Sequence, residues 1–118
     1  SFSYLRDQPE FRLLKVQGET RLYNYGYLYA DASALPVAAI GDTIRIDPDG
    51  QNKAFRAGAG ASIRFSIPEG GRIIVFTPGI SLLYDSLSSG SQDINIEAGS
   101  YILAIGQPGD AFELNGVK

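Results

Sequence analysis

Short runs in which apolar and polar residues alternate recur along the chain. In residues 61–67, ASIRFSI, one side is formed by Ile63, Phe65 and Ile67, and the other side is polar. Alternate side chains of a β-strand point to opposite faces, so this pattern predicts a strand with one buried face. Residues 93–98, DINIEA, repeat the pattern with two isoleucines between polar neighbours.

Two runs are apolar on both faces, as is typical of central strands: RIIVFT and YILAIG. Turn-forming Gly, Pro, Asn and Asp residues separate the runs at intervals of roughly eight to twelve residues. Further short runs complete the set: FRLLKV, DTIRID, NKAFRA, SLLYDS and AFELN. We count about nine to eleven strands and no amphipathic helix. The pattern predicts an all-β fold, a two-sheet antiparallel β-sandwich resembling a jelly roll.

The chain has 118 residues, which suits one domain, and we expect a single sandwich over residues 1–118. Residues 11–16 are predicted to form its first strand. Residues 1–8 lack a clear pattern and are interpreted either as part of that strand or as an extended arm that packs on a neighbour. The AGAGA segment, residues 57–61, predicts a tight turn or a loop lying close to other backbone.

The most specific feature is the segment RLYNYGYLYAD, residues 21–31, in which Tyr23, Tyr25, Tyr27 and Tyr29 occupy every second position. If the segment is one strand, all four tyrosines share a face. The reverse face then carries two leucines and suits the core, so the tyrosine face is expected to point outward. Tyrosine is enriched at protein interfaces, and we predict that these four residues bind a partner.

Two alternatives to a protein interface remain open for the tyrosine row. The tyrosines either pack beneath the N-terminal arm or form a platform on which a ligand stacks. A carbohydrate is one such ligand, although the chain has no Trp. A nucleic acid is not expected, because the net charge is −3 and few cations flank the row.

The amino-acid composition excludes the side chains on which most enzymatic mechanisms depend. The chain has neither His nor Cys, so the commonest general base, the thiolate nucleophile and the usual transition-metal ligands are missing. We therefore predict a protein that is not an enzyme and has no cofactor. No apolar run approaches the roughly 18 residues that a membrane span requires, so no membrane partner is expected.

Charge is distributed unevenly along the chain. Residues 73–117 contain five acidic residues and no Lys or Arg, whereas residues 1–72 are nearly neutral. The sequence Asp47-Pro48-Asp49-Gly50 resembles part of an EF-hand loop, which makes Asp47 and Asp49 calcium candidates. The same sequence is also typical of a plain turn, in which Asp bonds its own backbone.

The C-terminal half has a familiar order of motifs. FSIPEGGRIIVF, ISLLYDS and IEAGSYILAIGQPGDAFEL resemble the bacterial pre-peptidase C-terminal domain, and the resemblance covers residues 43–114. Ala98-Gly99-Ser100-Tyr101 and Phe112 match that family's ending. The resemblance implies a non-catalytic accessory β-sandwich of a secreted enzyme. NKAFRA replaces the family's aspartate-tyrosine opening segment, so that segment lends no support to the family's calcium sites.

These observations lead to two hypotheses about function. In the first, the chain is a small structural protein of the virion or decoration type, which self-assembles or docks on a repeating protein surface. In the second, it is a secreted accessory domain that binds carbohydrate or protein beside an enzyme. The corresponding locations are the virion and the extracellular space.

Overall fold

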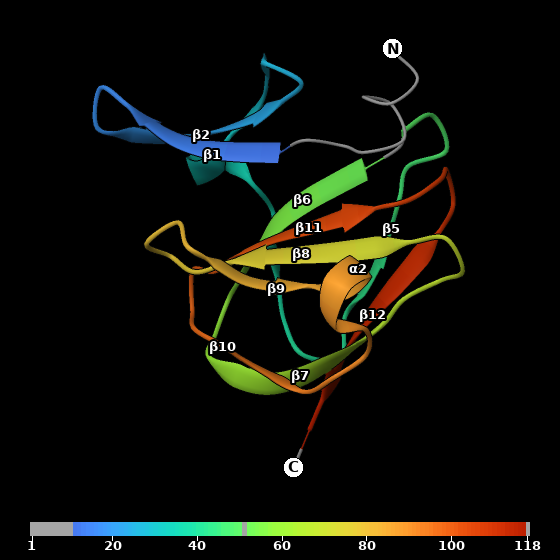
Figure 1. The fold of residues 1–118 in the computed structure, drawn as a ribbon. Helices are drawn as coiled ribbons and strands as arrows, with labels where there is room; N and C mark the ends of the chain where they lie inside the picture. The colour runs from blue at the N-terminus through green and yellow to red at the C-terminus, as the bar shows by residue number, and fades with distance from the viewer. Residues whose placement is uncertain (1–10, 51, 118) are drawn as a thin grey trace. The chain divides into compact units, whose positions relative to one another are not determined.

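The computed structural model describes residues 11–50 and 52–117, and these form an all-β protein (Figure 1). The predicted fold class is therefore confirmed. Every paired strand is antiparallel to its neighbour, except that β4 is parallel to β6. The chain divides into two compact units, residues 1–35 and 36–118. The N-terminal arm suggested for residues 1–8 lies outside the described residues.

The first unit contains a three-stranded sheet in the order β1-β2-β3, followed by a short 3-10 helix η1. Its elements are β1 (Phe11–Val16), β2 (Glu19–Asn24), β3 (Tyr27–Asp31) and η1 (Ala32–Ala34). The strand predicted at residues 11–16 has those bounds, but it belongs to this separate sheet and not to the sandwich. The reason is local, because two tight turns fold β1, β2 and β3 onto one another within 21 residues.

The second unit holds two sheets, ordered β10-β7-β12-β5 and β4-β6-β11-β8-β9. Figure 1 shows β6, β11, β8 and β9 lying in that order as one layer. The elements are β4 (Val37–Ala38), β5 (Thr43–Arg45), β6 (Asn52–Ala57), β7 (Ala61–Ser66), β8 (Arg72–Phe76), β9 (Leu82–Asp85), α2 (Ser86–Ser89), β10 (Ile94–Ile96), β11 (Tyr101–Ile105) and β12 (Ala111–Gly116).

Pairing in the second unit is nested. Strand β5 pairs with β12, β6 with β11, β7 with β10 and β8 with β9. Strands β5 to β8 and β9 to β12 thus form the two arms of one long hairpin, which is folded so that its pairs are divided between the two sheets. This is the pairing order of a jelly roll. The second unit therefore has two sheets paired in the order of a jelly roll. The described residues as a whole form three sheets, and not the two that were predicted for residues 1–118, because residues 11–31 fold into a sheet of their own.

The sandwich core is formed by the inward side chains of both sheets. Phe55, Val75 and Ile102 come from the five-stranded sheet, and Phe65 and Phe112 come from the four-stranded sheet. All five are buried. A fully buried side chain of this size contributes roughly 1.5–3 kcal/mol relative to exposure, so this layer dominates the stability of the unit.

The AGAGA segment lies close to its neighbours, as the sequence predicted. A Cβ atom at Gly58 would lie 2.9 Å from Cγ1 of Val37, and one at Gly60 would lie 3.3 Å from the carbonyl oxygen of Ile96. The glycines allow β4 and β10 to approach this loop.

Candidate interaction surface

The tyrosine segment folds as a hairpin and not as one strand. Tyr23 lies in β2, Tyr25 and Gly26 form the turn, and Tyr27 opens β3. The φ angles of Tyr25 and Gly26 are 55° and 83°. Two successive positive φ angles are the signature of a type I′ turn, which suits the twist of a two-residue hairpin. The prediction of a single strand was wrong because the glycine that makes this turn lies inside the alternating pattern.

The hairpin divides the tyrosines between faces. Tyr23 lies opposite Leu28 and Tyr27 lies opposite Asn24. Successive cross-strand pairs point to opposite faces, so these two tyrosines do not form the predicted row. Tyr29 is the extra residue of the irregular register between β2 and β3.

Leu22 and Leu28, both predicted on the reverse face, lie on opposite faces of the sheet. Leu22 is fully buried, as expected, and its cross-strand partners are Leu13 and Ala30. Leu28 shares a face with Tyr23 and is 54% exposed. The bulge reverses the side to which Leu28 points, which the two-residue periodicity does not reveal.

Tyr29 is 39% exposed, but one side of its ring packs within the first unit. Its ring meets the ring of Phe11 edge to face, with centroids 5.7 Å apart and an angle of 87°. Phe11 begins β1 and Tyr29 lies in β3, so the contact joins the two edge strands across β2. This finding favours a packing role for Tyr29.

The other face of the sheet presents a mixture of apolar and charged side chains. Arg12, Tyr23 and Leu28 form one cross-strand row, and Leu14 and Arg21 lie in the next. Leu14 is 48% exposed. We call this set of five residues the outer face of the N-terminal sheet. Apolar and aromatic groups surrounded by charged groups are the usual anatomy of a protein interface.

Arg21 is positioned by its neighbours on that face. One of its terminal nitrogens lies 3.4 Å from the Glu19 carboxylate, and Nε lies 4.0 Å from the Asp31 carboxylate. A hydrogen bond to the Tyr23 side chain, and then the bond to Glu19, raise the pKa of Arg21 above its ordinary value. The guanidinium is therefore a permanent positive charge beside Tyr23.

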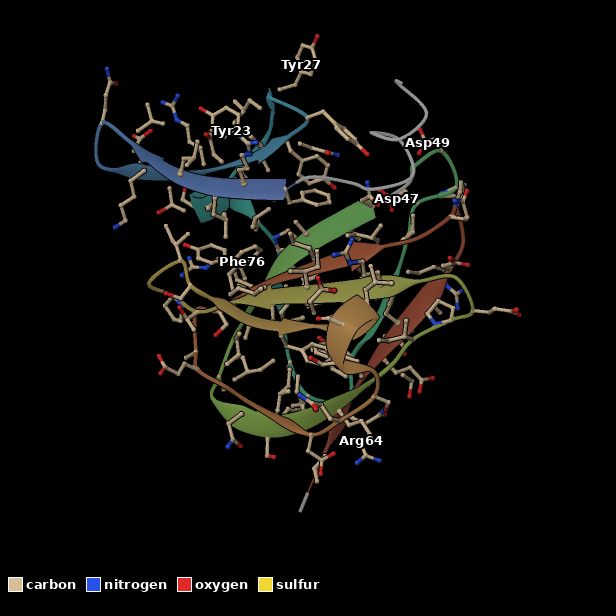
Figure 2. All side chains as sticks on the ribbon, in the orientation of Figure 1. Tyr23, Tyr27, Asp47, Asp49, Arg64 and Phe76 are labelled. Carbon is tan, nitrogen blue, oxygen red and sulfur yellow. The ribbon has the colours of Figure 1, made fainter. Side chains whose placement is uncertain are left out.

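The hairpin tip adds the most exposed aromatic side chain among the described residues. Tyr27 is 80% exposed, and Figure 2 shows it at the end of the hairpin. Tyr25 holds the first turn position, which normally selects Asn, Asp or Gly. In the β1–β2 turn, Gln17 and Gly18 have nearly the same φ angles, 54° and 83°. Gln17 therefore adopts the same backbone conformation with a polar side chain, and the turn itself does not require an aromatic residue at Tyr25.

The calcium candidates lie in the second unit and form a turn. The amide of Gly50 donates to the carbonyl oxygen of Asp47 over 2.9 Å, and Nζ of Lys53 lies 3.4 Å from the Asp47 carboxylate. Within residues 11–50 and 52–117, no group of three or more acidic or other metal-binding side chains gathers. A calcium site at Asp47 and Asp49 would therefore have to compete with Lys53.

The perturbed acidic and phenolic groups of the sandwich are explained by packing. Arg72 lowers the pKa of Asp85 by hydrogen bonding to its carboxylate. Burial raises the pKa of Tyr84, whose hydroxyl donates to the carbonyl oxygen of Gly90. An ionised carboxylate held by Arg is poorly suited to act as a general acid, and this pair is interpreted as structural.

Among the described residues, none of the helices is long and apolar enough to cross a membrane. Comparison with protein-family models, with curated proteins and with solved structures found no match to the chain.

Proposed function

We propose that the protein is a non-enzymatic interaction module that docks on a repeating protein surface, in the manner of a virion decoration protein. The docking surface is the outer face of the N-terminal sheet together with the hairpin tip, where Tyr25 and Tyr27 lie. Tyr27 does not share the outer face, but it is 80% exposed at the end of the hairpin and would contact the same partner there. The observation that carries the proposal is the exposure of Tyr27 and Leu28 beside a hairpin whose turn does not need an aromatic residue.

The chemistry of this surface selects a protein partner. Tyr and Arg are the residues that most often carry the binding energy of interfaces, and each can contact apolar groups while bonding to a polar one. Leu14 and Leu28 add apolar area next to Tyr23. A partner that fits has an apolar depression with a polar rim, and the depression would receive Tyr23 and Leu28.

The jelly-roll sandwich supports a structural role by analogy alone. Jelly rolls occur in viral capsid proteins and in lectins, and a fold does not determine a function.

The proposal is tested on particles purified from the natural source. Antibodies against the chain should label intact particles in electron micrographs at regular positions. The purified protein should rebind to particles that have been stripped of it. Finding the chain only in the surrounding medium, with no binding to stripped particles, would overturn the proposal.

The alternative is a secreted accessory domain that binds carbohydrate or protein. It is favoured by the resemblance of residues 43–114 to the pre-peptidase C-terminal domain. The turn Ala98–Ser100, strand β11, a loop and strand β12 with Phe112 follow in the order that the resemblance implies. Saturable binding to an insoluble polysaccharide, undiminished by substitution of Tyr23 and Tyr27, would favour this alternative.

A further inference from the structure

Strand β12 ends in Asn115-Gly116, the one Asn-Gly sequence in the chain. An asparagine followed by glycine is the combination most susceptible to spontaneous deamidation, because glycine has no side chain to hinder attack by its own amide nitrogen. The other asparagines, Asn24, Asn52 and Asn95, precede Tyr, Lys and Ile. Whether Asn115 reacts therefore depends on how the fold holds this pair.

Asn115 and Gly116 are exposed, and in the strand ladders of the described residues they pair on one side only. Strand β12 pairs with β5 over Ala111–Glu113, whereas its pairing with β7 continues to Gly116. Beyond Gly116, the amide of Val117 donates to the carbonyl oxygen of Ser62 over 3.0 Å. The end of a strand held in this way opens locally at a much smaller cost than the centre of a sheet.

Two contacts oppose deamidation while the end of β12 is paired. Nδ2 of Asn115 donates to Oγ of Ser66 over 2.7 Å, so the side-chain amide is held toward β7. The pairing of Asn115 with Arg64 keeps the backbone extended. Deamidation requires the side chain to turn back onto the next amide nitrogen, so this end of β12 must open before the reaction occurs.

We propose that Asn115 is a site of spontaneous deamidation and that opening of the end of β12 sets its rate. The amide nitrogen of Gly116 attacks Cγ of Asn115, and its proton passes through solvent to Nδ2. The bond between Cγ and Nδ2 breaks, and ammonia leaves a cyclic succinimide behind. Water then opens the ring at either carbonyl and leaves aspartate or isoaspartate at position 115. Water is the only co-reactant.

The product would change the solvent-facing side of β7 and β12. Arg64 lies opposite position 115, and its Nε donates to the Asp93 carboxylate over 2.7 Å. A carboxylate at position 115 would compete with Asp93 for this guanidinium. Isoaspartate also lengthens the main chain by one carbon, which disrupts the pairing of Gly116 with Ile63. The modified fraction would therefore record how often this end has opened, and it does not depend on docking by the N-terminal sheet.

The first test compares Asn115 with Asn95, which is also exposed and lies in a strand but precedes a branched residue. The folded chain is aged at mildly alkaline pH and then cleaved after glutamate. Cleavage separates residues 114–118 from residues 70–97, so mass spectrometry measures the two asparagines independently. Asn115 should be converted to aspartate and isoaspartate while Asn95 stays unmodified. Equal modification of the two residues would overturn the proposal.

The second test asks whether pairing sets the rate. Unfolding in urea should speed modification of Asn115 at least about 10-fold, because the end of β12 then no longer has to open. Ser66→Ala should speed it roughly 2- to 10-fold in the folded chain, because one neutral hydrogen bond is lost. The matched control is Ser62→Ala on the same side of β7, which should leave the rate unchanged, since the contact of Ser62 with β12 uses its carbonyl oxygen. Equal rates in the folded and unfolded chain, or equal rates in the two serine variants, would contradict control by the paired strand.

Discussion

Arg72 donates two hydrogen bonds to the Asp85 carboxylate, from Nε over 2.9 Å and from a terminal nitrogen over 2.6 Å. The pair joins β8 to the end of β9, and both side chains are mostly buried. Asp85 also accepts a bond from the amide of Leu87 over 3.0 Å and so caps helix α2. One carboxylate therefore connects three elements.

We expect Asp85→Asn to destabilise the protein by about 2 kcal/mol, because it weakens a charge-assisted pair and leaves Arg72 partly buried without its counter-charge. Urea unfolding at pH 7 measures the change. The matched control is Asp93→Asn, which breaks the exposed Arg64–Asp93 pair of 2.7 Å. That variant should change stability by less than about 0.5 kcal/mol. Equal effects would contradict a special role for the buried pair.

The same pair predicts an acid-dependent loss of stability. The pKa of Asp85 is lowered in the folded protein from its ordinary value of 3.8. Its contribution is therefore complete above that value and disappears as the pH falls through the lower, folded pKa. Between pH 5 and pH 2 the free energy of unfolding should fall more steeply in the wild type than in Asp85→Asn. Parallel curves would show that Asp85 has no shifted pKa.

The hairpin tip predicts a separation of stability from binding. Tyr25→Asn should stabilise the fold by about 0.5–1 kcal/mol, because Asn accepts a positive φ more readily than an aromatic residue does. Gln17→Asn, at the equivalent turn, should stabilise it similarly. Of the two variants, only Tyr25→Asn should weaken docking to particles. A Tyr25→Asn variant that docks normally would remove Tyr25 from the surface.

Ile80 is held in a strained conformation in the β8–β9 turn, with a φ of 68°. A β-branched residue is sterically unfavourable in that region, whereas glycine adopts it without a steric clash and loses only its larger backbone entropy on folding. Ile80→Gly should raise stability by about 1 kcal/mol and the melting temperature by about 4 °C. Ile80→Val keeps the branch at Cβ and should give no gain. A lower melting temperature for Ile80→Gly would show that the side chain contributes more than the strain costs.

The contact between Phe11 and Tyr29 predicts energetic coupling across β2. A double-mutant cycle of Phe11→Leu and Tyr29→Leu, measured by chemical unfolding, should give a coupling energy of about 0.5–1.5 kcal/mol. A coupling near zero would mean that the edge-to-face geometry adds nothing to the burial of the two rings.

Sequence periodicity captured those parts of the fold that are determined locally. The alternation around Ile63 and Phe65 predicted β7, and the pattern of residues 11–16 matched the bounds of β1. Partners distant in sequence, such as β5 and β12, follow from packing of the whole core and could not be paired by pattern alone.

The candidate surface was only partly accessible from sequence. The concentration of tyrosines pointed to the segment that we propose for docking, but Gly26 converts it into a hairpin and the bulge at Tyr29 moves Leu28 to the side of Tyr23. The available sequence signal for a type I′ turn was Gly26, which follows Asn24 and Tyr25 within the alternating pattern. Leu14 and Arg12 joined the surface through strand pairing, which periodicity does not specify.

Docking through the N-terminal sheet is tested most directly by measuring the affinity of the purified chain for stripped particles. The double variant Tyr23→Ala, Tyr27→Ala should unfold cooperatively like the wild type and bind at least about 10-fold more weakly. Val37→Ala, Ile40→Ala, which removes two exposed apolar side chains of the second unit, should bind like the wild type. Unchanged affinity of the tyrosine variant, or an equal loss in both variants, would contradict the account.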